Sequence, residues 1–108
     1  MKSYLAAAIS MTSVPDLAKN LSQAEELIDL AIRQGAELVT LPENFSFLGG
    51  EEEKISQAEA IAEKSEKFLK TIAQKYQITI LGGGYPVPTT NGKVYNVASL
   101  IEPNGIEV

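Results

Sequence analysis

The chain has 108 residues, 44% of them hydrophobic, and its nine basic and fourteen acidic residues give a net charge of -5. This length suits one small domain, and the acidic balance argues against nucleic acid and anionic membranes as partners, because both favour a basic face. The sequence holds no cysteine and no histidine, so it can form no disulfide and offers no thiol nucleophile, and we expect neither a metal site nor a cofactor.

The first half of the chain reads as a strand, a helix and a second strand. Tyr4–Met11 is nearly all apolar and uncharged, which favours a buried strand, although its alanines would also suit a helix. Asp16 then offers a helix start, and Gly35 lies where the helix would end. Apolar residues between them recur every three or four positions, at Leu21, Ala24, Ile28 and Ala31. With a strand at Leu38–Leu41, the pattern predicts a parallel β-α-β unit.

The second half reads as a helix followed by a β-hairpin. Glu51–Gln77 is charged, with a helical apolar stripe at Phe68, Leu69, Ile72, Ala73 and Tyr76. Ser65 is a plausible N-cap, although a start nearer Lys54 stays open. A strand at Ile78–Leu81 is predicted to end at the glycines 82–84. Asn91-Gly92 then predicts a hairpin turn before a strand at Val94–Ile101. After a turn at 103–105, Ile106–Val108 reads as the start of a further strand.

Nothing in the sequence reads as an export signal or a membrane span. The apolar run at Leu5–Ile9 is too short for the core of a signal peptide and lacks a cleavage site. No segment approaches the length of a membrane helix. We therefore expect a cytoplasmic protein.

One carboxylate comes directly after the second predicted strand. Glu43 follows Pro42, and ligands of open α/β sheets gather at the carboxyl ends of such strands. Glu43 is therefore a candidate general base, and Phe45 and Phe47 could exclude water from it. The alternative is an ordinary solvated carboxylate, with the two phenylalanines serving as core.

Two further features invite a functional interpretation. Gly82–Gly84 resembles a phosphate-binding loop, but such loops lead into a helix, and here Tyr85 and Pro86 follow. Close backbone packing or a β-bulge explains the glycines better. Asn96 is polar within a largely apolar strand, so it needs a partner if it is buried. A structural hydrogen bond across the sheet is the favoured interpretation, and a place in a substrate pocket is the alternative.

A series of short motifs runs in a specific order through the whole chain. The motifs are Ser10-Met11, Asn20-Leu21, Ala31 with Gly35-Ala36, LVTLPE at 38–43, Ala58-Glu59, ILGGG at 80–84, VYN at 94–96 and EPNG at 102–105. Their order and spacing resemble the carbon–nitrogen hydrolase family, the nitrilase superfamily, and LPE at a strand end is the most diagnostic. Ser10 is a departure, because many members carry glutamine before the methionine.

The resemblance implies an α/β fold, the four-layer α-β-β-α sandwich of the nitrilase-like enzymes. Residues 1–108 would form the N-terminal portion of a single hydrolase domain, incomplete at its C-terminus, with a β-α-β start followed by a helix and a hairpin. The family uses a Glu–Lys–Cys triad, whose general base falls on Glu43. The lysine and the cysteine would lie beyond Val108. The resemblance also makes Phe45 and Asn96 candidate pocket residues, and it implies no cofactor.

The function implied is an amidase that hydrolyses a small carboxylated amide. PENFSFLGG at 42–50 and KVYN at 93–96 resemble the branch acting on deaminated glutathione, and the omega-amidases are the near alternative. The expected partners are the amide substrate and either the remainder of the same domain or an identical subunit. The alternative from another class is a non-catalytic half-domain or degenerate subunit that serves as an interaction module.

Overall fold

The computed structural model describes residues 5–108, so Tyr4, the first residue of the first predicted strand, lies outside the described part. A β-α-β start is followed by two consecutive helices and a final hairpin. The elements are β1 (Leu5–Ala8), α1 (Leu17–Arg33), β2 (Ala36–Leu41), α2 (Glu51–Ser56), α3 (Ala58–Tyr76), β3 (Thr79–Pro88) and β4 (Val94–Ile101). The predicted α/β class is confirmed.

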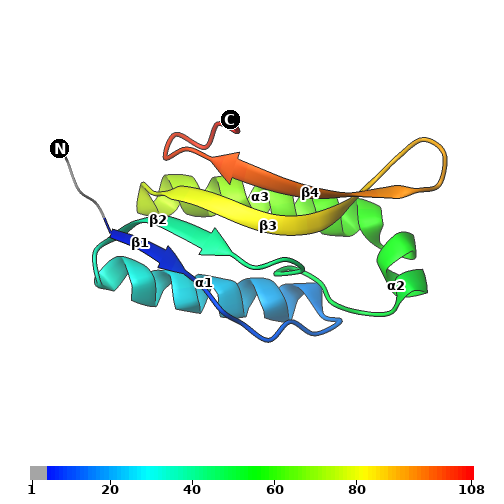
Figure 1. Ribbon diagram of the computed structural model, residues 1–108, viewed down its shortest axis with the longest axis horizontal. Coiled ribbons are helices and arrows are strands. Elements are labelled where there is room, and N and C mark those ends of the chain that lie inside the picture. Colours follow the sequence, from blue (N-terminus) through cyan, green and yellow to red (C-terminus); the bar gives the residue numbers. More distant parts are fainter. Residues whose placement is uncertain (1–4) are drawn as a thin grey trace.

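The strands form one mixed sheet in the order β1-β2-β3-β4 (Figure 1). β1 and β3 both run parallel to β2, while β4 pairs antiparallel with β3 through the hairpin. The predicted β-α-β start and hairpin are therefore confirmed. At Ile106–Val108 the chain returns beside β4, where Glu107 bridges to Ile101 and the amide of Val108 donates to the carbonyl of Leu100 at 2.9 Å.

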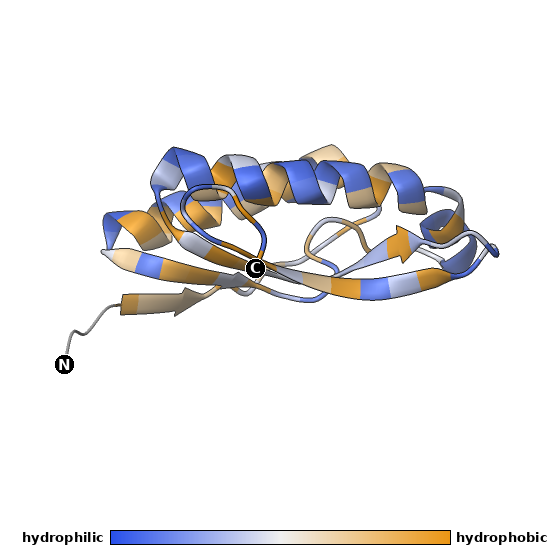
Figure 2. Ribbon diagram, turned by 90° about the horizontal axis from the view of Figure 1, so that it is seen from above, coloured by the Kyte–Doolittle hydropathy of each residue, from blue (hydrophilic) through white to orange (hydrophobic). Residues whose placement is uncertain are grey.

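Both long helices, α1 and α3, cover the same face of the sheet (Figure 2). The core lies between these two layers, where Ile28 of α1, Leu69 of α3 and Val39 of β2 are fully buried. Strand side chains alternate between the two faces. The positions pointing away from the helices form what we call the open face: Ala6, Ala8, Leu38, Thr40, Leu81 and Leu100. No element among residues 5–108 covers it.

The first helix begins and ends where the sequence indicates. The Asp16 side chain accepts a hydrogen bond from the amide of Lys19 at 3.1 Å, as an N-cap does. Gly35 follows the helix with a φ of 96°, which glycine adopts without strain. Glu25 of α1 accepts from Lys75 Nζ at 2.6 Å and from the Tyr76 hydroxyl at 3.1 Å, both on α3. The hydrogen bond from Lys75 lowers the pKa of the Glu25 carboxyl and ties α1 to α3.

The prediction that Ser65 caps the second long helix is wrong. α3 begins at Ala58, and Ser65 lies well inside it with a fully buried side chain. A serine can take such a place when its hydroxyl finds a partner, and Ser65 donates to the hydroxyl of Ser46 at 2.7 Å.

Two predicted strand limits are also corrected. β1 ends at Ala8 and not at Met11, although Ile9 still donates from its amide to the carbonyl of Thr40. β3 continues through the glycines to Pro88. β2 pairs with β3 only as far as Gly82, so Pro86 and Pro88 lie where β3 has β4 alone as a neighbour. A proline is tolerated there because no second strand requires its missing amide hydrogen.

Candidate active site

Glu43 lies in the loop that leaves the carboxyl end of β2, and its side chain is exposed. Its Oε1 atom accepts a hydrogen bond from Nδ2 of Asn96, on β4, at 3.1 Å. The two residues are 53 positions apart in the sequence. β3 lies between β2 and β4 in the sheet, and the Asn96 side chain lies over Gly84 of β3, where it reaches Glu43. Asn96 is exposed, and its side chain does make a hydrogen bond, but the partner is the candidate base in the loop after β2. A place for Asn96 in a substrate pocket stays a prediction.

The glycines of β3 let the Glu43 loop lie directly against the strand. A Cβ atom on Gly83 would stand 2.5 Å from the Leu41 carbonyl oxygen and 2.9 Å from the Glu43 amide nitrogen, and one on Gly84 would collide with the Asn96 side chain. The pairing of β3 with β4 shifts register between Gly82 and Tyr85. Close packing and a bulge, the favoured interpretation of these glycines, are both confirmed.

A tight turn after β2 separates Glu43 from the residues that follow. The Asn44 amide donates to the Gly84 carbonyl at 2.8 Å, and the Phe45 amide donates to the Pro42 carbonyl at 3.2 Å. Asn44 has a φ of 60°, a left-handed conformation that asparagine tolerates better than most residues. The turn leaves Glu43 exposed and sends Phe45 into the core.

The aromatic residues of this loop belong to the core of the described structure. The ring of Phe45 is fully buried, with its centroid 6.3 Å from that of Phe68 and 6.2 Å from that of Tyr85. Phe47 is buried as well. Burial raises the pKa of Tyr85, whose hydroxyl lies 2.8 Å from that of Ser99 and stays protonated at neutral pH. The Phe45 ring has no exposed surface among residues 5–108, so it lines no open pocket there. Its place in a substrate pocket stays a prediction.

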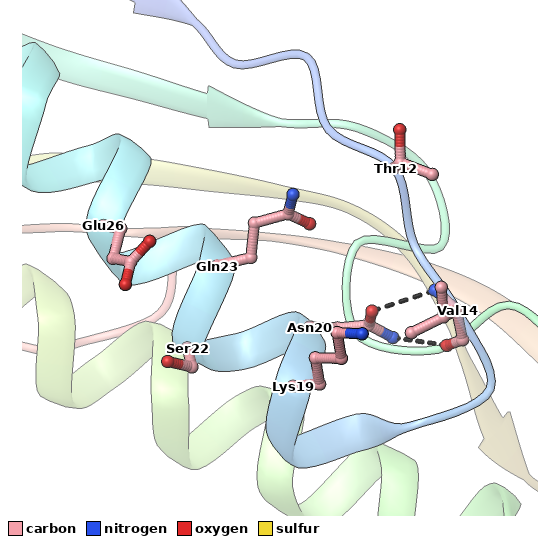
Figure 3. Close-up of a pocket in the computed structure, with 7 residues that line it drawn as sticks. All are labelled: Thr12, Val14, Lys19, Asn20, Ser22, Gln23 and Glu26. Carbon is pink, nitrogen blue, oxygen red and sulfur yellow. Dashed lines mark hydrogen bonds between the residues drawn. The ribbon is translucent and has the colours of Figure 1, made fainter.

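A buried polar cluster, which sequence reasoning missed, holds the far end of the same loop. We call it the Asn20 clamp; it consists of Asn20, Val14, Ser46 and Ser65. Nδ2 of Asn20 donates to the Val14 carbonyl at 2.6 Å, and its Oδ1 accepts from the Val14 amide at 2.9 Å (Figure 3). Nδ2 also donates to the Ser46 carbonyl at 2.8 Å. The hydroxyl of Ser65 holds Ser46 from α3. The clamp joins α1, α3 and the segment before α1 to the Glu43 loop.

The sequence does carry a signal for this cluster. Asn20 falls four positions before Ala24 and eight before Ile28, so it lies on the buried stripe of α1. Ser65 likewise lies four positions before Leu69 on the buried stripe of α3. A polar residue on an apolar stripe needs hydrogen-bond partners. The identity of those partners, however, depends on the tertiary arrangement of distant segments.

A cleft of about 490 Å³ lies beside the Asn20 clamp, between α1 and the segment that precedes it (Figure 3). Lys19 and Glu26 stand along its α1 side. Glu43, Phe45 and Asn96 do not line it. In residues 5–108 no three His, Cys, Asp or Glu side chains gather in a way that could hold a metal ion. None of the helices in the same range is long and apolar enough to cross a membrane.

We expect the Asn20 clamp to contribute measurably to stability. Asn20→Ala leaves the Val14 amide and the Val14 and Ser46 carbonyls without their partner. Buried polar groups left unpaired cost about 1–3 kcal/mol, so the free energy of unfolding should fall by at least that much. Urea unfolding of the chain followed by circular dichroism measures the change. Ser22→Ala, at an exposed position of the same helix, should stay within about 0.5 kcal/mol of the unmodified chain. Equal midpoints for the Asn20→Ala and unmodified chains would contradict the role of the clamp.

Known proteins similar to this chain include amidases. A deaminated glutathione amidase from Synechocystis sp. is 64% identical over 110 residues, which cover 100% of this chain and 40% of that protein. The omega-amidase NIT2 of Danio rerio is 38% identical over 88 residues, covering 82% of this chain and 31% of that protein. Among solved structures, the C. elegans NitFhit protein superposes with a TM-score of 0.88 at 29% identity, over 96% of this chain and 26% of that one.

The chain thus spans less than half the length of these relatives. The structural likeness to the NitFhit protein nevertheless extends over 96% of this chain. The sequence model of the carbon–nitrogen hydrolase family matches residues 5–108, which is the whole of the described structure. The chain belongs to the carbon–nitrogen hydrolase family.

Proposed function

We propose that this chain is the N-terminal portion of an amidase and that Glu43 is its general base. One observation carries the proposal. In a chain 64% identical to an amidase, the Glu43 carboxylate stands at the carboxyl end of a parallel strand, held by a hydrogen bond from Asn96. Ligand sites of α/β sheets form at such strand ends.

The chemistry needs a nucleophile that this chain does not contain, since it has no cysteine. The resemblance to the family indicates that the rest of the domain supplies a cysteine and a lysine. A free thiol has a pKa of about 8.5 and is mostly protonated at neutral pH, so it reacts well only when a base removes its proton. Glu43 would be that base, and the lysine would stabilise the negative charge on the carbonyl oxygen.

The reaction then proceeds in two halves. The thiolate attacks the amide carbon, the carbon–nitrogen bond breaks, and the leaving nitrogen takes up the proton that Glu43 had accepted. This half leaves a thioester and releases ammonia or an amine. In the second half, Glu43 removes a proton from water, which attacks the thioester carbon. The products are a carboxylic acid and the regenerated thiol.

We propose a small carboxylated amide as the substrate, with deaminated glutathione first. The support is the 64% identity to an enzyme named for that substrate, against 38% identity to the omega-amidase of Danio rerio. Amides such as succinamate and alpha-ketoglutaramate are therefore the second choice. A cytoplasmic location and the absence of nucleic-acid and membrane partners remain predictions.

The open face supports the proposal that another part of the protein covers the sheet. Its side chains are alanine, threonine and leucine, and Leu100 is 36% exposed. An uncovered apolar sheet face of this kind marks an interaction surface. The remainder of the same domain would supply the second sheet and complete the four-layer sandwich. In the alternative function, a non-catalytic interaction module, an identical subunit would cover the open face instead.

The direct test is a hybrid amidase, in which this chain replaces the 110 matched residues of the Synechocystis enzyme. The proposal predicts that the hybrid hydrolyses deaminated glutathione, measured by chromatography of the released amine, and that ammonia release from succinamate is slower. A hybrid that folds, as judged by circular dichroism, but hydrolyses none of these amides would overturn the amidase proposal. It would favour the interaction module.

We expect residues 1–108 on their own to show no amidase turnover. Without a thiol the thioester cannot form. The effects of catalytic groups that act as a unit are not additive, so one group out of three should not retain a third of the activity. The measurement is ammonia and amine release from the same amides by the purified chain. Turnover that disappears in a Glu43→Gln chain would contradict the need for a cysteine.

A further inference from the structure

We propose that Asn96 is the positioning residue of the general base: it holds one oxygen of Glu43 so that the other is aimed at the reacting atoms. The inference rests on the proposed role of Glu43. Its first support is the hydrogen bond from Asn96 Nδ2 to Glu43 Oε1 at 3.1 Å. A carboxylate has two oxygens, and fixing one of them leaves Oε2 as the proton acceptor.

The second support is the space that the sheet reserves for this side chain. The amide group of Asn96 lies over Gly84, and any Cβ atom at that position would collide with its Oδ1 and Nδ2 atoms. The carbonyl of the same glycine accepts from the Asn44 amide at 2.8 Å, next to Glu43 in the chain. Gly84 therefore leaves room for the Asn96 side chain, and its carbonyl holds the backbone next to Glu43.

The third support is that Asn96 lies on a paired strand. Asn96 pairs with Pro86 in the antiparallel ladder of β3 and β4, whereas Glu43 lies in a loop. Sites are held more precisely by strands than by loops. A hydrogen bond from a strand is thus a direct way to fix a loop carboxylate, and a neutral amide does so without competing for the proton that the base must take.

The test compares two substitutions in the hybrid amidase. Asn96→Asp keeps the size and shape of the side chain but replaces the donor by a second carboxylate, and Asn96→Ala removes the side chain. Misplacing a catalytic group by about 1 Å costs on the order of 10²-fold in rate. We therefore expect kcat to fall by about 10- to 10²-fold in both variants, with KM changed less than about threefold. The unfolding temperature should stay close to that of the unmodified hybrid.

The pH profile separates positioning from a general loss of structure. In the Asn96→Asp variant two like charges compete for one proton, so the acid limb of kcat/KM should move to higher pH. Asn96→Ala removes the donor without adding a charge, so any movement of that limb should be smaller than in Asn96→Asp. Asn91→Asp makes the same change of charge in the hairpin turn, where Asn91 accepts from the Thr89 hydroxyl and an aspartate can still do so. It should leave both the rate and the pH profile unchanged.

A double substitution distinguishes the failure of this inference from that of the proposed function. In a Glu43→Gln background there is no base to position, so Asn96→Ala should cause no further loss. Wild-type kcat in both Asn96 variants, beside an inactive Glu43→Gln variant, would overturn the positioning role alone. So would a rise in KM with kcat unchanged, or a loss of activity that follows a matching loss of folded protein. Full activity of the Glu43→Gln variant would overturn the proposed function itself.

Discussion

Glu43→Gln is expected to slow the hybrid amidase by about 10²–10⁴-fold in kcat, the usual contribution of a positioned general base. The glutamine side chain has nearly the same shape, and its Oε1 can still accept the hydrogen bond that Asn96 donates to Glu43. It cannot take a proton from a thiol. Because residue 43 is exposed in a loop at the end of a strand, the folded structure should change little. Steady-state kinetics with deaminated glutathione measure the effect, with the unfolding temperature recorded in parallel.

The matched control is Glu66→Gln on α3. Glu66 is exposed and pairs with Lys70 at 2.8 Å, four positions along the helix. Exposed pairs of this kind add little to stability. The substitution makes the same chemical change away from the loop, so turnover should stay at the level of the unmodified hybrid. Near-normal turnover in the Glu43→Gln variant would remove the basis for the proposed mechanism.

Phe45→Ala is expected to have the largest effect on stability. The Phe45 ring is fully buried and packs against the rings of Phe68 and Tyr85. Truncating such a residue removes apolar burial and leaves a cavity, which costs about 3–5 kcal/mol of unfolding free energy. Urea unfolding of the chain followed by circular dichroism measures the loss.

The neighbouring Leu48 provides the control for this substitution. Its side chain is 50% exposed, so Leu48→Ala should cost much less than Phe45→Ala. If the two alanine variants unfolded at the same urea concentration, Phe45 would not be a core residue. The alternative assignment of Phe45 to the surface of a pocket would then be favoured.

Periodicity in the sequence predicts the elements but not all of their limits. The apolar stripes of α1 and α3 and the Asn-Gly turn are local signals, so the helices and the hairpin could be expected. The length of β3 could not, because glycines and prolines usually end a strand. They continue it here since β2 stops pairing at Gly82 and a loop packs against Gly83. Both reasons lie in other parts of the chain.

The site divides along the same line between local and distant information. Glu43 could be identified from its own neighbourhood, as a carboxylate following a buried strand. Its hydrogen bond with Asn96 could not, since the two residues are 53 positions apart and meet only through the strand order. The partners of Asn20 and Ser65 likewise come from the Glu43 loop and the segment before α1. Sequence pattern indicates that such polar residues need partners, and only the fold supplies them.

A crystal structure of the hybrid amidase tests the central claim, that Glu43 is the base of a cysteine-dependent amidase. We expect Asn96 Nδ2 still to donate to one carboxylate oxygen of Glu43. We also expect the other oxygen to lie within hydrogen-bond reach, about 2.6–3.2 Å and somewhat longer without substrate, of the cysteine sulfur supplied by the Synechocystis part. A Glu43 carboxylate that faces solvent, with the cysteine next to a different acidic side chain, would contradict the account.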